Sequence, residues 1–231
     1  MQKSMIKILS IADLLSILNA VFGFFAILVL LSDFFEYKFA IYISLSLILS
    51  ALLIDGIDGI VARKIGSSGI GEHLDSMADM TSLVIAPSVF LYFVYIDIVN
   101  CSIIRHFYLV FALILFLAFG IIRLASYYIM KKDKIFVGIP APAATIILIM
   151  LGYLKVDFIY ILPAVIIIGA LMASNIDFPK PDIKINAFAT LLIIFTIILR
   201  KDFYGIAPIL LLLGILVYAI GGPIYIRFFA K

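Results

Sequence analysis

The sequence predicts an all-α integral membrane protein, a polytopic helical bundle, from its composition and from the order of its residues. Hydrophobic residues make up 66% of the 231 positions and charged residues 13%, whereas about 25% of the residues in a soluble domain are charged. The apolar residues form long runs, and most charged residues fall between them. No water-soluble surface can be built from this composition, so the net charge of +3 does not indicate a nucleic-acid partner and the chain belongs among membrane lipids.

Eight apolar segments lie between the charged residues, and each is a candidate membrane span. Several approach the roughly 20 residues that a helix needs to cross the hydrocarbon core. They cover residues 11–32, 38–62, 73–99, 104–130, 141–155, 157–174, 185–199 and 204–228. Because the fifth and seventh are short, six spans with re-entrant pieces are the alternative. The sequence has no evident repeat, and we expect a single domain over residues 1–231.

An arrangement of eight spans places both termini on one side of the membrane, and the basic residues indicate which side. Eleven of them fall on the side of the termini and five on the other, which predicts cytoplasmic termini by the positive-inside rule. The eleven are Lys3, Lys7, Arg63, Lys64, Lys131, Lys132, Lys134, Lys180, Lys184, Arg227 and Lys231, and the five are Lys38, Arg105, Lys155, Arg200 and Lys201.

Four aspartates form the most informative motif of the sequence. Asp55 and Asp58 are three residues apart and share a helix face, and Asp75 and Asp79, four apart, share another. A Gly-Ser turn over residues 66–69 lets the two helices fold back on each other. The carboxylates can then converge at the cytoplasmic end of a helix pair, where their repulsion favours divalent cations. Solvated acids at helix ends are the alternative, but ionisable groups near membrane depth are usually functional.

At these residues the sequence resembles the CDP-alcohol phosphatidyltransferase family. The signature of that family is D-x-x-D-G-x-x-A-R, a spacer, and G-x-x-x-D-x-x-x-D. Its specified positions all occur here, as Asp55, Asp58, Gly59, Ala62, Arg63, Gly71, Asp75 and Asp79. The spacer between the two halves holds seven residues instead of the familiar eight, which affects the alignment of the turn and not that of the aspartates.

Flanking stretches resemble the phosphatidylserine synthase (or archaetidylserine synthase) branch of this family. They lie at residues 18–24, 74–87, 123–125, 136–144 and 171–179. The resemblance implies that a lipid phosphate group is transferred from CDP-diacylglycerol or CDP-archaeol to the serine hydroxyl, with release of CMP, in phospholipid biosynthesis. It also implies a homodimer, since members of the family are usually homodimers.

The resemblance further implies roles for individual residues. Asp55, Asp58, Asp75 and Asp79 would bind divalent metal, Mg or Mn and two ions in number, and Asp79 would also accept the hydroxyl proton. The residues carried over for the CDP-lipid are Asn19, Gly59, Ala62, Arg63, Ser68 and Gly71. Arg63 as a cytoplasmic anchor, and Gly59 and Ala62 as helix-packing residues, are the alternatives. Because Arg63 and Lys64 adjoin the motif, we expect the active site to face the cytoplasm.

Arg123 is the best clue to the acceptor, because it lies well inside an apolar span. Placing Arg there costs about 2.5–3.5 kcal/mol on insertion scales, so its side chain should face a carboxylate or a wet cavity. We interpret Arg123 as the group that binds the carboxylate of serine, with help from Ser82. Pairing of Arg123 with one of the aspartates is the alternative.

Two other functions fit parts of the pattern. The same chemistry with glycerol phosphate or inositol phosphate as acceptor would favour several basic residues near the metals, and Lys131, Lys132 and Lys134 are close to Arg123 in the sequence. A divalent-cation transporter could use the four aspartates, but transporters often contain internal repeats and broken helices at mid-membrane. The position of the motif next to Arg63 disfavours a transporter.

Overall fold

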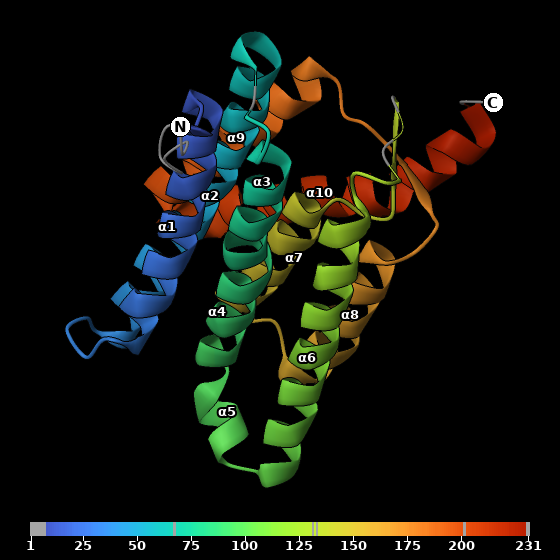
Figure 1. Cartoon of the computed structure of the whole chain (residues 1–231). Helices are drawn as coiled ribbons and strands as arrows, with labels where there is room; N and C mark the ends of the chain where they lie inside the picture. Colours follow the sequence, from blue (N-terminus) through green and yellow to red (C-terminus); the bar gives the residue numbers. More distant parts are fainter. Residues whose placement is uncertain (1–7, 67, 131, 133, 201, 230–231) are drawn as a thin grey trace. The chain divides into compact units, whose positions relative to one another are not determined.

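The computed structural model describes residues 8–66, 68–130, 132, 134–200 and 202–229, and the prediction of an all-helical protein is confirmed. In the described residues, one two-stranded antiparallel pair accompanies the helices (Figure 1). Of the basic residues used to predict the orientation, Lys3, Lys7, Lys131, Lys201 and Lys231 lie outside the described residues. The chain forms two compact units, Met1–Ala86 and Pro87–Lys231, and each is described by itself.

Among the described residues, five helical stretches are long and apolar enough to cross a membrane. They are Ile11–Leu31, Tyr37–Ile65, Gly71–Val94, Ile103–Ser126 and Gly205–Phe228. Three shorter apolar helices are Ala141–Tyr153, Phe158–Met172 and Ile183–Leu199. At about 1.5 Å per residue these three are roughly 20 to 26 Å long, less than the ~30 Å of the hydrocarbon core. Each of the eight apolar segments thus contains a helix, and five of these helices reach spanning length.

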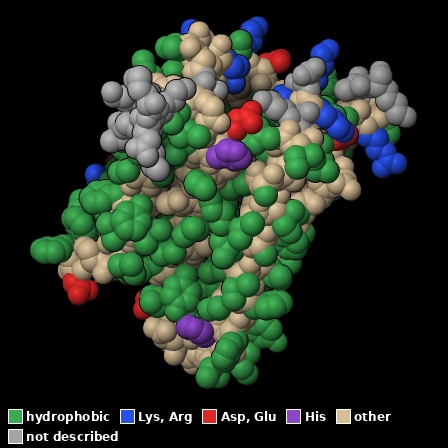
Figure 2. Space-filling view, viewed as in Figure 1, with side chains coloured by type: hydrophobic (Ala, Val, Ile, Leu, Met, Phe, Trp, Pro, Cys, Tyr) green, Lys and Arg blue, Asp and Glu red, His purple; other side chains and the backbone are tan. Residues whose placement is uncertain are grey.

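Hydrophobic side chains cover most of the surface drawn in Figure 2. Large apolar residues are exposed along the long helices, among them Phe24, Phe25, Phe111 and Val217. Water-soluble monomers rarely expose apolar patches of this extent, whereas lipid tails solvate such patches. Together with the five helices of spanning length, this surface identifies an integral membrane protein.

In the first unit, helix α1 (Ile11–Leu31) packs against α2 (Tyr37–Ile65) and α3 (Gly71–Asp79). A reciprocal capping arrangement begins α1: the Ser10 hydroxyl accepts from the Asp13 N–H (3.2 Å), and the Asp13 carboxylate accepts from the Ser10 N–H (2.6 Å). This arrangement satisfies two backbone donors that a helix start otherwise leaves unpaired. Helix α2 ends at Gly66, which has a φ of +96°.

A close approach between α1 and the segment after Asp79 sets the spacing of these helices. The chain continues from α3 into a π-helical segment, η2 (Met80–Ile85). A Cβ atom added at Gly23 of α1 would lie only 2.6 Å from the Cα atom of Ser82 in η2. The absence of a side chain at Gly23 therefore lets α1 lie directly against the helix that carries Asp75 and Asp79.

The second unit is built around α7 (Ala141–Tyr153), most of whose side chains are buried. A helix buried on all sides is apolar all round, as this one is. Helices α6 (Ile103–Ser126), α8 (Phe158–Met172) and α10 (Asp202–Phe229) contact α7, and α9 (Ile183–Leu199) contacts α10. The remaining helices are α4 (Ala86–Val94) and α5 (Ile96–Asn100).

Two short strands pair in the second unit, a feature that the sequence did not predict. Strand β1 (Ile135–Val137) runs antiparallel to β2 (Asp177–Pro179), with Phe136 opposite Phe178. We refer to this strand pair as the clasp. It follows α6, which ends at Ser126 and so stops short of the predicted boundary at residue 130. Strands of three residues are too short to show an alternating pattern, which explains why they could not be predicted from the sequence.

Candidate functional site

Three of the four motif aspartates lie together in the first unit. Asp55 comes from α2, and Asp75 and Asp79 come from α3. One carboxylate oxygen from each residue lies within 4.8 Å of the other two, and all three residues are half-buried. The chain reverses between Gly66 and Gly71, which brings the acidic end of α2 next to α3. We call Asp55, Asp75 and Asp79 the acid cluster.

The acid cluster concentrates negative charge that must be neutralised. Two ionised carboxylates 4.8 Å apart repel each other by about 3.5 kcal/mol at an effective dielectric constant of about 20. A hard divalent cation removes this repulsion and prefers carboxylate oxygens as ligands. The number, type and spacing of the oxygens in the acid cluster therefore fit a hard divalent cation.

Asp58 lies outside the acid cluster and has a different partner. Its side chain is buried, and its Oδ2 atom accepts a hydrogen bond from the Ser16 hydroxyl at 3.0 Å. The same hydroxyl is 3.3 Å from the Ala12 carbonyl oxygen, but a carboxylate is the stronger acceptor. The structure thus brings three of the four predicted metal ligands together, and metal binding by Asp58 stays a prediction.

Asn19 joins the acid cluster from α1. The side chain is completely buried, and its amide group donates to Asp79 Oδ1 at 3.2 Å. The other polar atom of this side chain, Oδ1, is buried and has no hydrogen-bond partner among the residues that the structure describes. A buried acceptor without a donor is unfavourable by roughly 1–3 kcal/mol. The predicted CDP-lipid residue therefore contacts the predicted proton acceptor, and its carbonyl oxygen is available to a donor from a ligand.

Ser16 is a site residue that the sequence analysis missed. Asp13, Ser16 and Asn19 are spaced three residues apart on α1, and all three are buried. Residues at this spacing lie on neighbouring parts of one helix face. Three polar side chains at helical spacing inside an otherwise apolar span were the signal that could have identified this face in the sequence.

Other residues predicted to bind the CDP-lipid lie at the end of α2. The Arg63 side chain folds back beside Gly59: a Cβ atom added at Gly59 would be 3.6 Å from Arg63 Nη1. Ala62 lies between them on the helix and is half-buried. The guanidinium of Arg63 is therefore next to the glycine that precedes it by one helical turn, and both residues belong to the acidic motif.

Ser68 and Gly71 form the turn between α2 and α3. The Ser68 carbonyl accepts from the Gly71 N–H at 3.1 Å, and the Ser68 hydroxyl accepts from the Ile70 N–H at 3.2 Å. Gly71 is buried at the first position of α3. These hydrogen bonds shape the turn, and the binding of the CDP-lipid by both residues stays a prediction.

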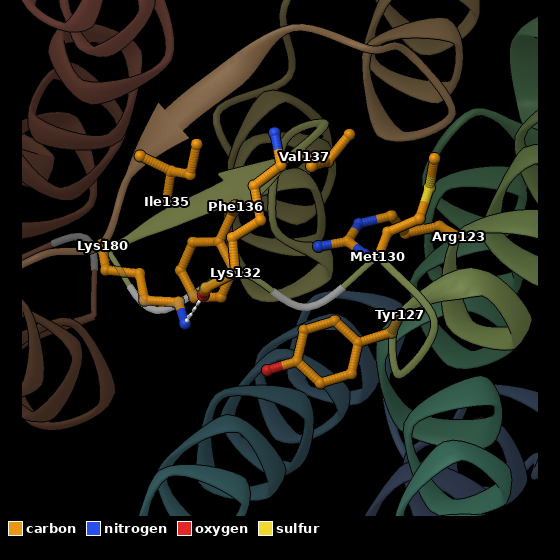
Figure 3. Close-up of a pocket in the computed structure, with 8 residues that line it drawn as sticks. All are labelled: Arg123, Tyr127, Met130, Lys132, Ile135, Phe136, Val137 and Lys180. Carbon is orange, nitrogen blue, oxygen red and sulfur yellow. Dashed lines mark hydrogen bonds between the residues drawn. The ribbon is translucent and has the colours of Figure 1, made fainter. Parts of the chain in front are cut away.

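A second group of polar residues surrounds a pocket in the second unit (Figure 3). The pocket is a shallow, open depression rather than an enclosed cavity, and its empty space of about 190 Å³ includes space open to solvent. It is lined by Arg123, Tyr127, Met130, Lys132, Ile135, Phe136, Val137 and Lys180. Residues of α6, of the segment after it and of the clasp therefore contribute to one pocket, which we call the basic pocket.

Arg123 is the buried cation of the basic pocket, with only 6% of its surface exposed. Its Nε atom donates to the Ile139 carbonyl at 3.4 Å, and its guanidinium carbon lies 5.3 Å from the centre of the Tyr127 ring. Both partners are neutral. They orient the guanidinium without cancelling its charge, so this group suits an anionic ligand such as a carboxylate.

Lys132 and Lys180 bring two further cations to the basic pocket. Lys132 forms an ion pair with Asp177 at 3.3 Å. The Lys180 ammonium donates to the Lys132 carbonyl, as Figure 3 shows, and lies 5.2 Å from the Phe136 ring. The sequence analysis did not connect Lys180 with Arg123, because pairing of distant strands brings Lys180 to the pocket.

Ser82, the second residue predicted to bind serine, is buried in the first unit. Its hydroxyl donates to the Ala78 carbonyl at 3.1 Å, and its backbone faces Gly23. These contacts are packing contacts within and between helices. A role of Ser82 in binding serine stays a prediction.

The sequence is similar to that of several known enzymes. A model of the CDP-alcohol phosphatidyltransferase family matches residues 9–220. A CDP-diacylglycerol–serine O-phosphatidyltransferase of Methanocaldococcus jannaschii is 35% identical over 225 residues, which cover 96% of each chain. An archaetidylserine synthase of Methanothermobacter thermautotrophicus is 30% identical over 188 residues, 78% of this chain and 74% of the relative. A serine O-phosphatidyltransferase of Helicobacter pylori is 31% identical over 163 residues, 65% and 66% of the two chains.

The Ser16 hydrogen bond generates a prediction about metal affinity. Replacing Ser16 with alanine removes the donor to Asp58, so the concentration of Mn²⁺ that gives half-maximal activity should rise roughly tenfold. The measurement is CMP release as a function of Mn²⁺ concentration. Ser46→Ala is the matched control, because the Ser46 hydroxyl donates to the carbonyl of Tyr42 within α2. Equal Mn²⁺ dependence in Ser16→Ala and in Ser46→Ala would show that Ser16 does not orient a metal ligand.

Proposed function

The chain belongs to the CDP-alcohol phosphatidyltransferase family, and on that premise we propose that it transfers the lipid phosphate group of CDP-diacylglycerol or CDP-archaeol to the hydroxyl of serine. CMP is the second product, and the reaction is a step of phospholipid biosynthesis. The observation that carries the proposal is the acid cluster of Asp55, Asp75 and Asp79, whose carboxylate oxygens lie within 4.8 Å of one another. The names of the relatives support serine as the acceptor.

The reaction forms a bond between the serine hydroxyl oxygen and the lipid-linked phosphorus, and it breaks the bond between that phosphorus and CMP. Asp79 accepts the proton of the attacking hydroxyl. The Asn19 amide holds one oxygen of Asp79 by a hydrogen bond of 3.2 Å and so orients the carboxylate. Arg63, beside Gly59, binds the diphosphate of the CDP-lipid. CMP leaves with the electrons of the broken bond.

The acid cluster would hold the divalent metal, with Asp58 as a further ligand. The metal supplies neutralisation of the diphosphate charge and of the charge that develops on the leaving CMP. The ions would be Mg²⁺ or Mn²⁺, two in number, and would supply stabilisation of the charge that develops during the transfer. Phosphoryl transfer depends mainly on positioning and charge stabilisation, and the chain provides both through its carboxylates and Arg63.

Recognition of serine is assigned to Arg123 in the basic pocket, with Ser82 as an assisting residue. The buried guanidinium has neutral partners in Ile139 and Tyr127, so its charge remains available to the serine carboxylate. Lys132 and Lys180 favour a second candidate function with a phosphate-bearing acceptor, glycerol phosphate or inositol phosphate. Lys132 is paired with Asp177, which reduces the positive charge of the pocket and favours the smaller charge of a carboxylate.

The topology completes the proposal. All eight apolar helices would lie in the membrane, the five long ones as spans and the three shorter ones tilted or paired. Both termini and the active site would face the cytoplasm, since Arg63 and Lys64 adjoin the acidic motif and basic residues prefer that side. One domain would carry the reaction, and two copies of the chain would form a homodimer.

The acceptor is tested by measuring CMP release from CDP-diacylglycerol and from CDP-archaeol with serine, glycerol phosphate and inositol phosphate in parallel. We expect metal-dependent CMP release with serine and at most background release with the two phosphate-bearing acceptors. If CMP is released with glycerol phosphate or inositol phosphate but not with serine, the acceptor is that phosphate compound. The reaction class would then be unchanged. Absence of release with all three, in protein that binds Mn²⁺, would refute the proposed function.

The role of Arg123 is tested by Arg123→Leu. Loss of a charge-assisted contact to the serine carboxylate should raise the KM for serine roughly 10- to 100-fold. The KM for the CDP-lipid should change less than about twofold, because Arg123 is assigned no contact with that substrate. Arg105→Leu, an exposed arginine of the same helix, is the control. An equal rise of both KM values in Arg123→Leu would contradict the assignment.

A further inference from the structure

Tyr218 of α10 contacts strand β2 of the clasp. The Tyr218 hydroxyl donates to the carbonyl oxygen of Pro179 in β2 at 3.0 Å, and its ring centre lies 6.1 Å from that of Phe178. Pro179, the acceptor of this hydrogen bond, is 39 residues from Tyr218 along the chain. A tyrosine in an apolar helix thus places its polar atom on the backbone of a strand rather than among hydrophobic side chains.

The strand register explains why the Pro179 carbonyl needs this donor. The Lys180 N–H donates to the Lys134 carbonyl, and the Gly138 N–H donates to the Ile176 carbonyl. In an antiparallel pair, every second residue pair exchanges hydrogen bonds, and the residues between them point their backbone groups outward. Pro179, opposite Ile135, is one of these outward residues. Its missing N–H costs the ladder nothing, and its carbonyl faces away from β1.

A second residue of α10, Gly222, also lies close to Pro179. A Cβ atom added at Gly222, one helical turn after Tyr218, would lie 2.9 Å from the Pro179 side chain. Glycine therefore lets α10 approach Pro179 closely enough for the Tyr218 hydrogen bond. The next residue, Lys180, carries one of the ammonium groups of the basic pocket.

From the clasp, backbone contacts lead to Arg123. Beyond β1, Gly138 has a φ of +75°, and a Cβ atom there would lie 2.4 Å from the Met172 carbonyl oxygen. The next N–H, of Ile139, donates to the Leu171 carbonyl at 3.0 Å. The Ile139 carbonyl in turn accepts from Arg123 Nε at 3.4 Å. The position of the guanidinium therefore depends on the backbone that follows β1.

We propose that Tyr218 is a positioning residue for the acceptor: through its hydrogen bond to Pro179 it fixes the clasp, and through the clasp it fixes Lys180 and Arg123 around the basic pocket. Tyr218 itself is not among the residues that line the pocket. The inference rests on the proposed function, in which the basic pocket binds the acceptor. It adds a specificity element from α10, a helix that the acidic motif and the flanking stretches of the sequence did not connect with the acceptor.

The kinetic test uses Tyr218→Phe, which removes the hydroxyl and keeps the ring against Phe178. Loss of one hydrogen bond should raise the KM for the acceptor roughly two- to tenfold, with kcat and the KM for the CDP-lipid changed less than twofold. Tyr160→Phe, at an exposed tyrosine of α8, is the control. Unchanged kinetics in Tyr218→Phe, or an equal loss for both substrates, would overturn the proposal. If the wild type uses a phosphate-bearing acceptor instead of serine, the same comparison is made with that acceptor.

A second pair of variants probes the same contact from another residue. Gly222→Ala places a methyl group against Pro179, whereas a Cβ atom at the neighbouring Gly221 meets nothing within 4 Å. Gly222→Ala should raise the acceptor KM as Tyr218→Phe does, and Gly221→Ala should behave as the wild type. Equal behaviour of the two alanine variants would count against a role of α10 in setting the pocket.

Hydrogen exchange separates this inference from the proposed function, because it requires no turnover. In Tyr218→Phe, amide exchange in peptides that cover residues 134–140 and 174–180 should be faster than in the wild type and in Tyr160→Phe, with the thermal unfolding midpoint nearly unchanged. Unaltered exchange in these peptides would overturn the positioning role even if serine is the substrate. If exchange is faster in Tyr218→Phe but the wild type never uses serine, Tyr218 still positions the clasp. In that case only the assignment of serine as the acceptor is refuted.

Discussion

Repulsion between carboxylates is the constraint on which the first unit depends. The oxygens of Asp55, Asp75 and Asp79 approach within 4.8 Å, an arrangement that is unfavourable without a counter-charge. Helix packing holds them there, since α1 packs against both α2 and α3 and Gly23 allows α1 to lie against η2. The favourable packing energy thus maintains a site whose charges would otherwise separate, and a cation bound to it would stabilise the same fold.

Helix α1 contributes more to this site than a membrane anchor would. One of its faces carries Asp13, Ser16, Asn19 and Gly23, which are all buried. Ser16 donates to Asp58 and Asn19 donates to Asp79, so a single helix face orients one carboxylate from each half of the motif. Since each hydrogen bond goes to one particular oxygen, the carboxylates have defined directions before any ligand binds, which favours tight binding of a metal.

The second unit contains a charged side chain, that of Arg123, in an apolar surrounding. Arg123 is buried among helices, and its contacts are a backbone carbonyl and an aromatic ring. The carbonyl belongs to Ile139, whose position follows from the clasp and from the left-handed backbone at Gly138. The backbone that follows strand β1 therefore offers a carbonyl oxygen to the Arg123 guanidinium in a region otherwise made of helices.

The sequence predicted the helices and the acidic motif well, because both leave short-range signals. Apolar runs between charged residues located the eight apolar helical stretches of the described residues, and the spacings of the aspartates indicated that each pair shares a helix face. The hydrogen bond from Ser16 to Asp58 was missed, although the spacing of Ser16 and Asn19 contained a signal for it. The clasp and the approach of Lys180 to Arg123 could not be predicted, because they depend on the pairing of segments about 40 residues apart, such as Val137 with Asp177.

The most direct test of this account is a crystal structure of the full chain soaked with Mn²⁺ and a CDP-lipid, measured at a wavelength where manganese scatters anomalously. The account predicts an anomalous peak bound by oxygens of Asp55, Asp75 and Asp79, at metal–oxygen distances of roughly 2.0–2.3 Å. The contrary result is a structure, at saturating Mn²⁺, in which these three side chains point away from one another and no ion lies between α2 and α3.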